Sequence, residues 1–144
     1  MKKVIASLKS NLVTSLVFII VLFSYNAASA QQNDMIVRIS EIEVDPSYLT
    51  EYKAILTEEA AASVRLEPGV ISIFPMYQKE NPTAVRILEI YASRVAYEAH
   101  LKTPHFQKYK TTTLKMVKSL KLVDMDGIDT ETMMTIFKKM KTSK

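Results

Sequence analysis

The chain of 144 residues contains no cysteine, no tryptophan and only two histidines. The absence of cysteine excludes a disulfide framework and a lipid-modified N-terminal cysteine. Two histidines without cysteine fall short of the three or four ligands of a usual zinc site, so we expect no bound metal. Both histidines, His100 and His105, lie in the stretch HLKTPHF, on either side of Thr103-Pro104.

The first thirty residues have the features of an export signal. A lysine-rich start at 2–9 precedes an apolar run at 12–23, and the sequence ASA at 28–30 offers the small residues that signal peptidase accepts. The apolar run is too short to span a bilayer comfortably. We expect cleavage after Ala30, giving a periplasmic or secreted protein with no stable membrane insertion. An uncleaved anchor is the alternative.

Without the expected signal, the chain keeps 114 residues, which is enough for one domain with a core but not for two. Three of the 19 basic residues leave with the signal, so 16 basic residues balance 15 acidic ones. A nucleic-acid binder should show a concentrated basic face, so we expect no nucleic-acid partner. Residues 99–144 are nevertheless basic, which indicates either an anionic ligand or a solvated helix face.

Apolar periodicity predicts the order βαββαβ within a domain at 31–126. We expect four strands from alternating and β-branched residues, at 35–44, 70–77, 84–91 and 120–125. We expect one helix from Pro46 to Leu66 and a second, broken helix at 93–101 and 103–118, each with a capping residue at its start. This order is typical of the α+β ferredoxin-like class, a four-stranded antiparallel sheet with helices on one face.

The third expected strand is apolar on both faces. Val85, Ile87 and Tyr91 alternate with Leu88 and Ile90, whereas a strand with one face in water should alternate apolar and polar residues. We therefore expect a homodimer in which the second sheet face packs on that of an identical subunit.

The tail at 127–144 combines apolar residues at helical spacing with lysines. Such a segment either lies on a membrane surface or partner, or packs on its own domain or frays.

The two histidines are expected at the ends of neighbouring helices. His100 falls in the last turn of the short helix, where the helix dipole favours the charged imidazole. His105 falls in the first turn of the next helix, where the dipole favours the neutral form. A pair in opposite fields could divide the roles of acid and base. Alternatively, each ring satisfies a local hydrogen bond.

Three polar residues interrupt surfaces that should be apolar. Glu89 shares a strand face with apolar residues, and Glu59 and Ser63 lie on or beside the apolar stripe of the first helix. Carboxylates there are costly unless they are hydrogen-bonded or paired. Together with an imidazole they predict a small-molecule pocket between helices and sheet. We expect Tyr91, Phe106 and Tyr109 to form core or pocket wall, which suggests a flat, aromatic ligand.

Three stretches resemble the antibiotic biosynthesis monooxygenase domain family: SVRLEPGV at 63–70, RILEIYAS at 86–93 and AYEAHLKTPHFQKYK at 96–110. The resemblance covers about residues 35–126 and is closer to the quinol monooxygenase and autoinducer-2 degrading type. It implies a ferredoxin-like homodimer, packed sheet against sheet, with one pocket per subunit. It also implies oxidation of phenols or quinols by O2 without flavin, haem or metal.

The resemblance assigns roles to individual residues. His100 matches the pocket histidine of the family pattern, Glu89 its strand carboxylate, Ser63 its helix hydroxyl and His105 its second histidine. The chain departs from the related haem-degrading enzymes, because it has no tryptophan and Lys110 or its neighbours stand where their axial histidine is expected. The export signal also departs from a family mostly expected in the cytoplasm.

These observations predict a cofactor-independent oxygenase for a quinol-like substrate. His100 would take the phenolic proton as general base, and Glu89 would hold the imidazole in one tautomer. Ser63 and the first-turn amides near His105 would bind a substrate oxygen. One alternative is an isomerase that moves a proton on a small hydroxy-ketone. Another is a dimer that binds an aromatic ligand without chemistry.

Overall fold

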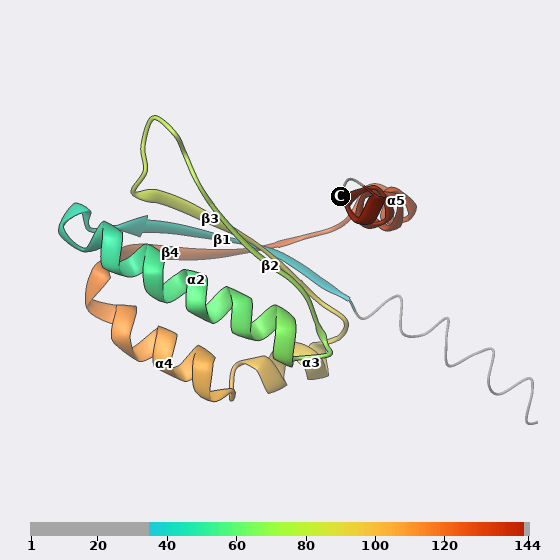
Figure 1. The fold of residues 1–144 in the computed structure, drawn as a ribbon, viewed down its shortest axis with the longest axis horizontal. Helices are drawn as coiled ribbons and strands as arrows, with labels where there is room; N and C mark the ends of the chain where they lie inside the picture. The colour runs from blue at the N-terminus through green and yellow to red at the C-terminus, as the bar shows by residue number, and fades with distance from the viewer. Residues whose placement is uncertain (1–34, 143–144) are drawn as a thin grey trace, which may run out of the picture. The chain divides into compact units, whose positions relative to one another are not determined.

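The computed structural model describes residues 35–142, and Figure 1 shows them as a sheet with helices along one face. The expected export signal at 1–30 lies outside the described residues. Among the described residues, no helix is long and apolar enough to cross a membrane.

Four strands form one antiparallel sheet in the order β2-β3-β1-β4. The strands are β1 Ile36–Val44, β2 Val70–Tyr77, β3 Ala84–Tyr91 and β4 Val117–Met125. The two central strands, β1 and β3, are adjacent although the first helix separates them in sequence. This topology confirms the ferredoxin-like prediction.

The helices begin where the sequence predicts them. The first helical segment comprises the 3-10 turn Pro46–Tyr48 and α2 Leu49–Leu66, and the broken second segment comprises α3 Arg94–His100 and α4 Pro104–Thr113. Side chains of Asp45, Ser93 and Thr103 accept hydrogen bonds from backbone N–H groups in the first turns, which satisfies donors that a helix start leaves unpaired. In the tail, α5 spans Thr130–Thr142.

The end of the broken helix differs from the prediction. A helix to residue 118 was expected, but α4 ends at Thr113, a 3-10 turn covers Leu114–Met116, and β4 begins at Val117 rather than at 120. Backbone pairing explains the difference: the N–H of Asp45 donates to the carbonyl of Met116 over 2.8 Å, and Val117 pairs with Val44. The β-branched threonines before Leu114 also favour a helix end, because they lose rotamer freedom inside a helix.

The core lies between α2 and the inner face of the sheet. Tyr52, Leu56 and Ala60 of α2 are buried and belong to one apolar cluster with Val44 and Val85 of the central strands. Their spacing of four residues places them on one side of the helix, as the apolar periodicity predicts.

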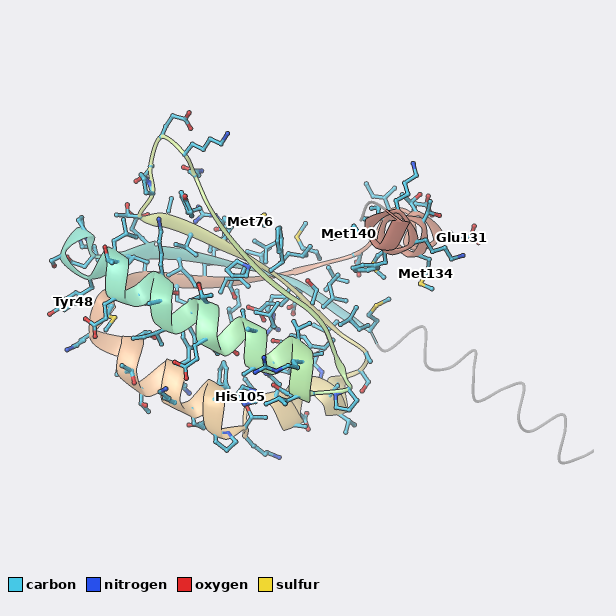
Figure 2. The ribbon with its side chains drawn as sticks, viewed as in Figure 1. Tyr48, Met76, His105, Glu131, Met134 and Met140 are labelled. Atoms are coloured by element: carbon cyan, nitrogen blue, oxygen red, sulfur yellow. The ribbon has the colours of Figure 1, made fainter. Side chains whose placement is uncertain are left out.

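The opposite, outer face of the sheet is also apolar. Strand register places on this face Val37 and Ile39 of β1, Phe74 and Met76 of β2, Leu88 of β3, and Val123 and Met125 of β4. Phe74 is 58% exposed, Met125 47% and Met76 39%, and Figure 2 labels Met76 on the side of the sheet away from α2 and α4. Ile90 of β3 shares this face with Leu88, so the prediction that β3 is apolar on both faces is confirmed. Another part of the outer face is charged, because the same register places Glu41, Arg86 and Lys121 there.

A tight turn, Glu67-Pro68-Gly69, joins α2 to β2. The carbonyl of Gly69 accepts a hydrogen bond from the N–H of Ala92 over 2.8 Å, and a Cβ atom added to Gly69 would lie 2.5 Å from the Cβ of Ala96. Glycine is therefore required here for a close approach between this turn and α3.

We expect Gly69→Ala to lower the free energy of unfolding by about 1–3 kcal/mol, because α3 would have to move away from the turn. Urea denaturation measures the change, and Gly127→Ala in the exposed segment before α5 is the matched control. Equal stability of the Gly69 variant and the parent would show that α3 moves without cost.

Candidate functional site

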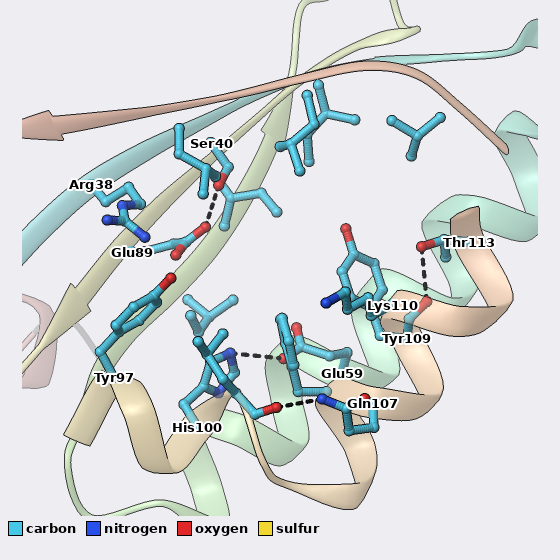
Figure 3. A pocket seen from close by; sticks show the side chains of 18 of the residues that line it. Arg38, Ser40, Glu59, Glu89, Tyr97, His100, Gln107, Tyr109, Lys110 and Thr113 are labelled. Carbon is cyan, nitrogen blue, oxygen red and sulfur yellow. Dashed lines mark hydrogen bonds and ion pairs between the residues drawn. The ribbon is translucent and has the colours of Figure 1, made fainter. Parts of the chain in front are cut away.

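A cavity of about 470 Å³ lies on the helical side of the sheet. Its floor comes from β1, β3 and β4, and its walls come from α2, α3 and α4, as Figure 3 shows from close by. Most of the lining is apolar, including Ile42, Ile87 and Phe106, with a few polar side chains among them. Its volume and lining are typical of small-molecule sites.

His100 reaches this cavity from the last residue of α3. Its side chain is 3% exposed, and its Nδ1 lies 3.0 Å from Oε1 of Glu67. The rings of Phe106 and Tyr91 flank the imidazole, with centroids 4.6 and 5.4 Å away. Hydrogen bonds from the two histidines lower the pKa of Glu67 against the opposing effect of burial, so this carboxyl group is ionised. An ionised carboxylate only accepts, and Nδ1 of His100 therefore carries the proton.

The free nitrogen of His100 is Nε2, which lies 3.8 Å from Oε1 of Glu59. That separation suits an ion pair but is too long for a hydrogen bond. Burial raises the pKa of Glu59, and Ser63 donates a hydrogen bond of 2.7 Å to its Oε1. The cavity wall therefore presents an imidazole nitrogen beside a carboxyl group that holds its proton more strongly than usual.

His105 lies behind this wall, in the first turn of α4. Its Nε2 is 2.6 Å from the same Oε1 of Glu67, and its side chain is 20% exposed. Figure 2 labels His105 in the helical layer. The cavity lining does not include His105 or the fully buried Ser63. The predicted contacts of these two residues with substrate remain predictions, and in this structure each contacts a carboxylate instead.

Glu67, His100 and His105 offer three potential metal-ligand atoms within 4.8 Å of one another. Tetrahedral zinc with Zn–N bonds of ~2.0–2.1 Å holds its ligand atoms roughly 3.3 Å apart. One oxygen already accepts hydrogen bonds from both rings, and the rings would have to move to reach that spacing. In this structure the three groups form a hydrogen-bonded cluster.

Glu89 occupies the sheet floor of the cavity, away from the imidazole. Ser40 of β1 donates to its Oε1, and Tyr91 donates to its Oε2 over 2.9 Å. The expectation that Glu89 holds the tautomer of His100 is therefore wrong, because Glu67 holds the ring. Glu89 instead presents a fixed acceptor at another part of the cavity wall, as Figure 3 shows.

The aromatic wall is arranged largely as predicted. Phe106, Tyr91 and Tyr109 all line the cavity. The hydroxyl groups of Tyr109 and Tyr52 lie 2.7 Å apart, and burial raises the pKa of Tyr109 to about 12. Burial also raises the pKa values of Tyr52 and Tyr91. These phenols therefore stay protonated at neutral pH and serve as wall and hydrogen-bond donors rather than as bases.

Two polar residues of the site were missed by the sequence reasoning. Glu67 was interpreted only as part of a helix-ending turn, and nothing in local spacing connects it with residues 33 and 38 positions later. Arg38 lines the cavity, donates from Nε to Asp124 over 2.6 Å and stacks on Tyr97 with its guanidinium carbon 4.8 Å from the ring centroid. Its place on the inner face of β1, among apolar residues, was a signal that could have identified it.

A family model and several solved structures match this chain. The family model described as ABM, antibiotic biosynthesis monooxygenase, matches residues 35–112. A solved structure from Bacteroides thetaiotaomicron, described as a "Putative antibiotic biosynthesis monooxygenase", is 48% identical, with 67% of this chain and 92% of that chain covered and a TM-score of 0.66. No curated protein matches the sequence.

More distant structures share the fold. A protein from Nitrosomonas europaea is 23% identical, with 67% of this chain and 93% of that chain covered and a TM-score of 0.63. A protein from Pseudomonas aeruginosa is 18% identical, with 67% and 96% covered and a TM-score of 0.62. The family match and the Bacteroides relative support an oxidoreductase of the monooxygenase kind. The chain belongs to the antibiotic biosynthesis monooxygenase family.

Proposed function

We propose that the protein oxidises a small phenol or quinol with O2, and that His100 is the general base. The observation that carries the proposal is the state of His100: Nδ1 donates to Glu67, while Nε2 faces an apolar cavity beside Glu59. A carboxylate that holds one imidazole nitrogen leaves the other free to accept a proton, as in catalytic triads. Family membership supports the oxygenase chemistry.

The reaction begins with proton transfer from the substrate hydroxyl to Nε2 of His100. The resulting phenolate is a much better electron donor to O2 than the neutral phenol. One oxygen atom enters the substrate ring to give a quinone, and the other leaves as water. All four electrons that reduce O2 come from the substrate, so the proposed reaction needs no flavin, haem or metal.

Two fixed groups would orient the substrate. Glu89 accepts hydrogen bonds from Ser40 and Tyr91 and so has a defined position on the cavity floor, where it can accept a hydrogen bond from a substrate hydroxyl. Glu59, with its raised pKa, can donate its proton to a substrate oxygen near His100. A ring that carries oxygen substituents at different positions fits this arrangement of acceptor, donor and base.

O2 uptake over a panel of hydroquinones and naphthoquinols tests the proposal, with product analysis after reaction with ¹⁸O2. Uptake above autoxidation, with one labelled oxygen per product, is the expected result. Turnover of a hydroxy-ketone under nitrogen would instead indicate an isomerase. Saturable binding of the aromatic compounds with no product would indicate a binding protein.

We also propose that two subunits pack together through the outer sheet faces. Eight large apolar side chains from all four strands lie on that face, Ile90 among them, and three of the eight are at least 39% exposed in the single chain. An apolar patch of this kind on a soluble domain commonly marks an interface. The proposed homodimer leaves the cavity on the helical side of each subunit.

Leu88→Lys, at the centre of this face, should convert the dimer to a monomer in light scattering, because a lysine buried in an apolar interface would lose its hydration without gaining a partner. Val95→Lys makes the same kind of change on α3, where the parent side chain is 74% exposed, and should leave the mass unchanged. A parent protein with the mass of a single chain would overturn the proposed dimer.

A further inference from the structure

Two imidazole rings share a single carboxylate oxygen beside the cavity. Oε1 of Glu67 lies 3.0 Å from Nδ1 of His100 and 2.6 Å from Nε2 of His105. The exposed fractions of the side chains are 3% for His100, 12% for Glu67 and 20% for His105. The cluster thus extends from the buried cavity wall towards solvent, with the more accessible ring at its outer end.

The charges of this cluster do not balance when both rings are protonated. Glu67 supplies one negative charge, whereas two imidazolium ions would supply two positive ones, with ring centroids 6.5 Å apart. The second protonation is therefore opposed by repulsion in a largely buried site. Two such groups titrate as a coupled pair rather than independently.

Other titratable groups surround the pair. From the described part of the chain they include Glu59 of α2, Glu89 and Tyr91 of β3, and Tyr109 of α4. The same cavity is also lined by Arg38 of β1, Tyr97 of α3 and Lys110 of α4, none of which is an anion at neutral pH. Burial favours the protonated forms of Glu59 and the two tyrosines, and Glu89 is occupied by Ser40 and Tyr91. Glu67 is therefore the main counter-ion for both histidines.

We propose that His105 carries the positive charge of the resting cluster and thereby keeps His100 neutral. The helix ends act the other way, because they favour a charged His100 and a neutral His105. The more exposed ring keeps more of its hydration, so charging it costs less, and this difference has to outweigh the helix ends. This inference rests on the proposed function for the role of His100 as base, and it makes His105 a positioning residue that acts through Glu67.

The same arrangement couples proton uptake to proton release. When Nε2 of His100 takes the substrate proton, the cluster holds two imidazolium ions and one carboxylate, and His105 then gives its outer proton to water. When His100 later passes its proton to a reduced oxygen atom, His105 takes one proton back from water. The number of protons is conserved in both steps, and the net charge of the cluster returns to zero.

NMR titration of the imidazole Hε1 signals in the full-length protein tests the proposal directly, because the chain contains only two histidines. In the parent protein the rings should titrate in two separate steps, with His100 becoming charged at the lower pH. His105→Gln keeps a hydrogen-bond donor but removes the competing charge. It should therefore move the His100 midpoint to higher pH by about 1–2 units, the size expected for two charges at this separation.

Two further variants make the test independent of any single substitution. His105→Arg replaces the protonated ring by a permanent cation and should therefore leave the His100 midpoint close to that of the parent protein. Glu98→Gln removes an exposed charge on α3 and should leave the midpoint within about 0.3 units, since exposed charges are well screened. A His100 midpoint that is the same in the parent, His105→Gln and His105→Arg proteins would overturn the proposal.

The NMR readout needs no substrate, so it separates this inference from the proposed oxygenase. Where O2 uptake is present, the acid limb of its pH profile should move with the His100 midpoint in each variant. A raised His100 midpoint in His105→Gln and a parent-like midpoint in His105→Arg, without any O2 uptake, would support the shared counter-ion and overturn the proposed oxygenase. Normal O2 uptake together with the same His100 midpoint in every protein would support the proposed oxygenase and overturn the shared counter-ion.

Discussion

Replacing His100 with alanine should lower the rate of O2 uptake by about 10²–10⁴-fold, the usual contribution of a general base. The variant loses the nitrogen that accepts the phenolic proton, and the neutral substrate donates electrons to O2 poorly. Raising the pH should recover part of the rate, because hydroxide then generates the phenolate that the enzyme no longer forms. An oxygen electrode with a fixed quinol concentration measures both effects.

Because His100 is 2% exposed, its loss also removes packing against Phe106 and leaves Glu67 with one partner fewer. His100→Gln, which retains much of the volume and can donate to Glu67, should be equally inactive while unfolding closer to the parent temperature. Glu98→Gln, two residues earlier in α3, is the control for activity. Parent-like rates in both His100 variants would show that another group takes the proton.

Leu56→Ala should lower the free energy of unfolding by about 2–5 kcal/mol, the range for truncating a buried leucine. Leu56 is 3% exposed and lies on the face of α2 that packs in the core cluster. The truncation leaves a cavity between helix and sheet in addition to the lost burial. Urea denaturation at one fixed protein concentration measures the change, since association of subunits would stabilise the fold by mass action.

Val64→Ala is the matched control on the same helix. Val64 is 48% exposed, and its truncation should change the free energy of unfolding by less than about 0.5 kcal/mol. A Leu56→Ala effect as small as that of Val64→Ala would mean that the helix moves inward and refills the space.

Much of the fold could be predicted because its signals are local. Alternating or β-branched apolar residues located β1, β2 and β3, and the capping residues Asp45, Ser93 and Thr103 located the helix starts. The start of β4 could not be predicted in this way. It depends on pairing with Val44, and such a long-range contact leaves no periodic signal in the residues that precede Leu120.

The sequence predicted which residues line the site better than it predicted which residues they contact. His100, Glu89 and Glu59 were chosen because polar residues on apolar faces need a partner, and the structure places all three on the cavity. The partners themselves depend on tertiary geometry. Glu67 reaches the histidines because α2 packs beside α4, and local sequence does not encode that proximity.

The two edge strands affect how this domain can associate. An exposed edge presents unpaired backbone groups that can template growth of a continuous sheet, which leads to aggregation. β2 carries Pro75, which has no N–H to offer, and β4 carries Lys118 and Lys121, whose charges disfavour a neighbouring strand. Addition of strands is thus discouraged at both edges, and the apolar outer face is left as the route by which copies can meet. The residues of both edge strands therefore fit the proposed closed pair of subunits better than an open polymer.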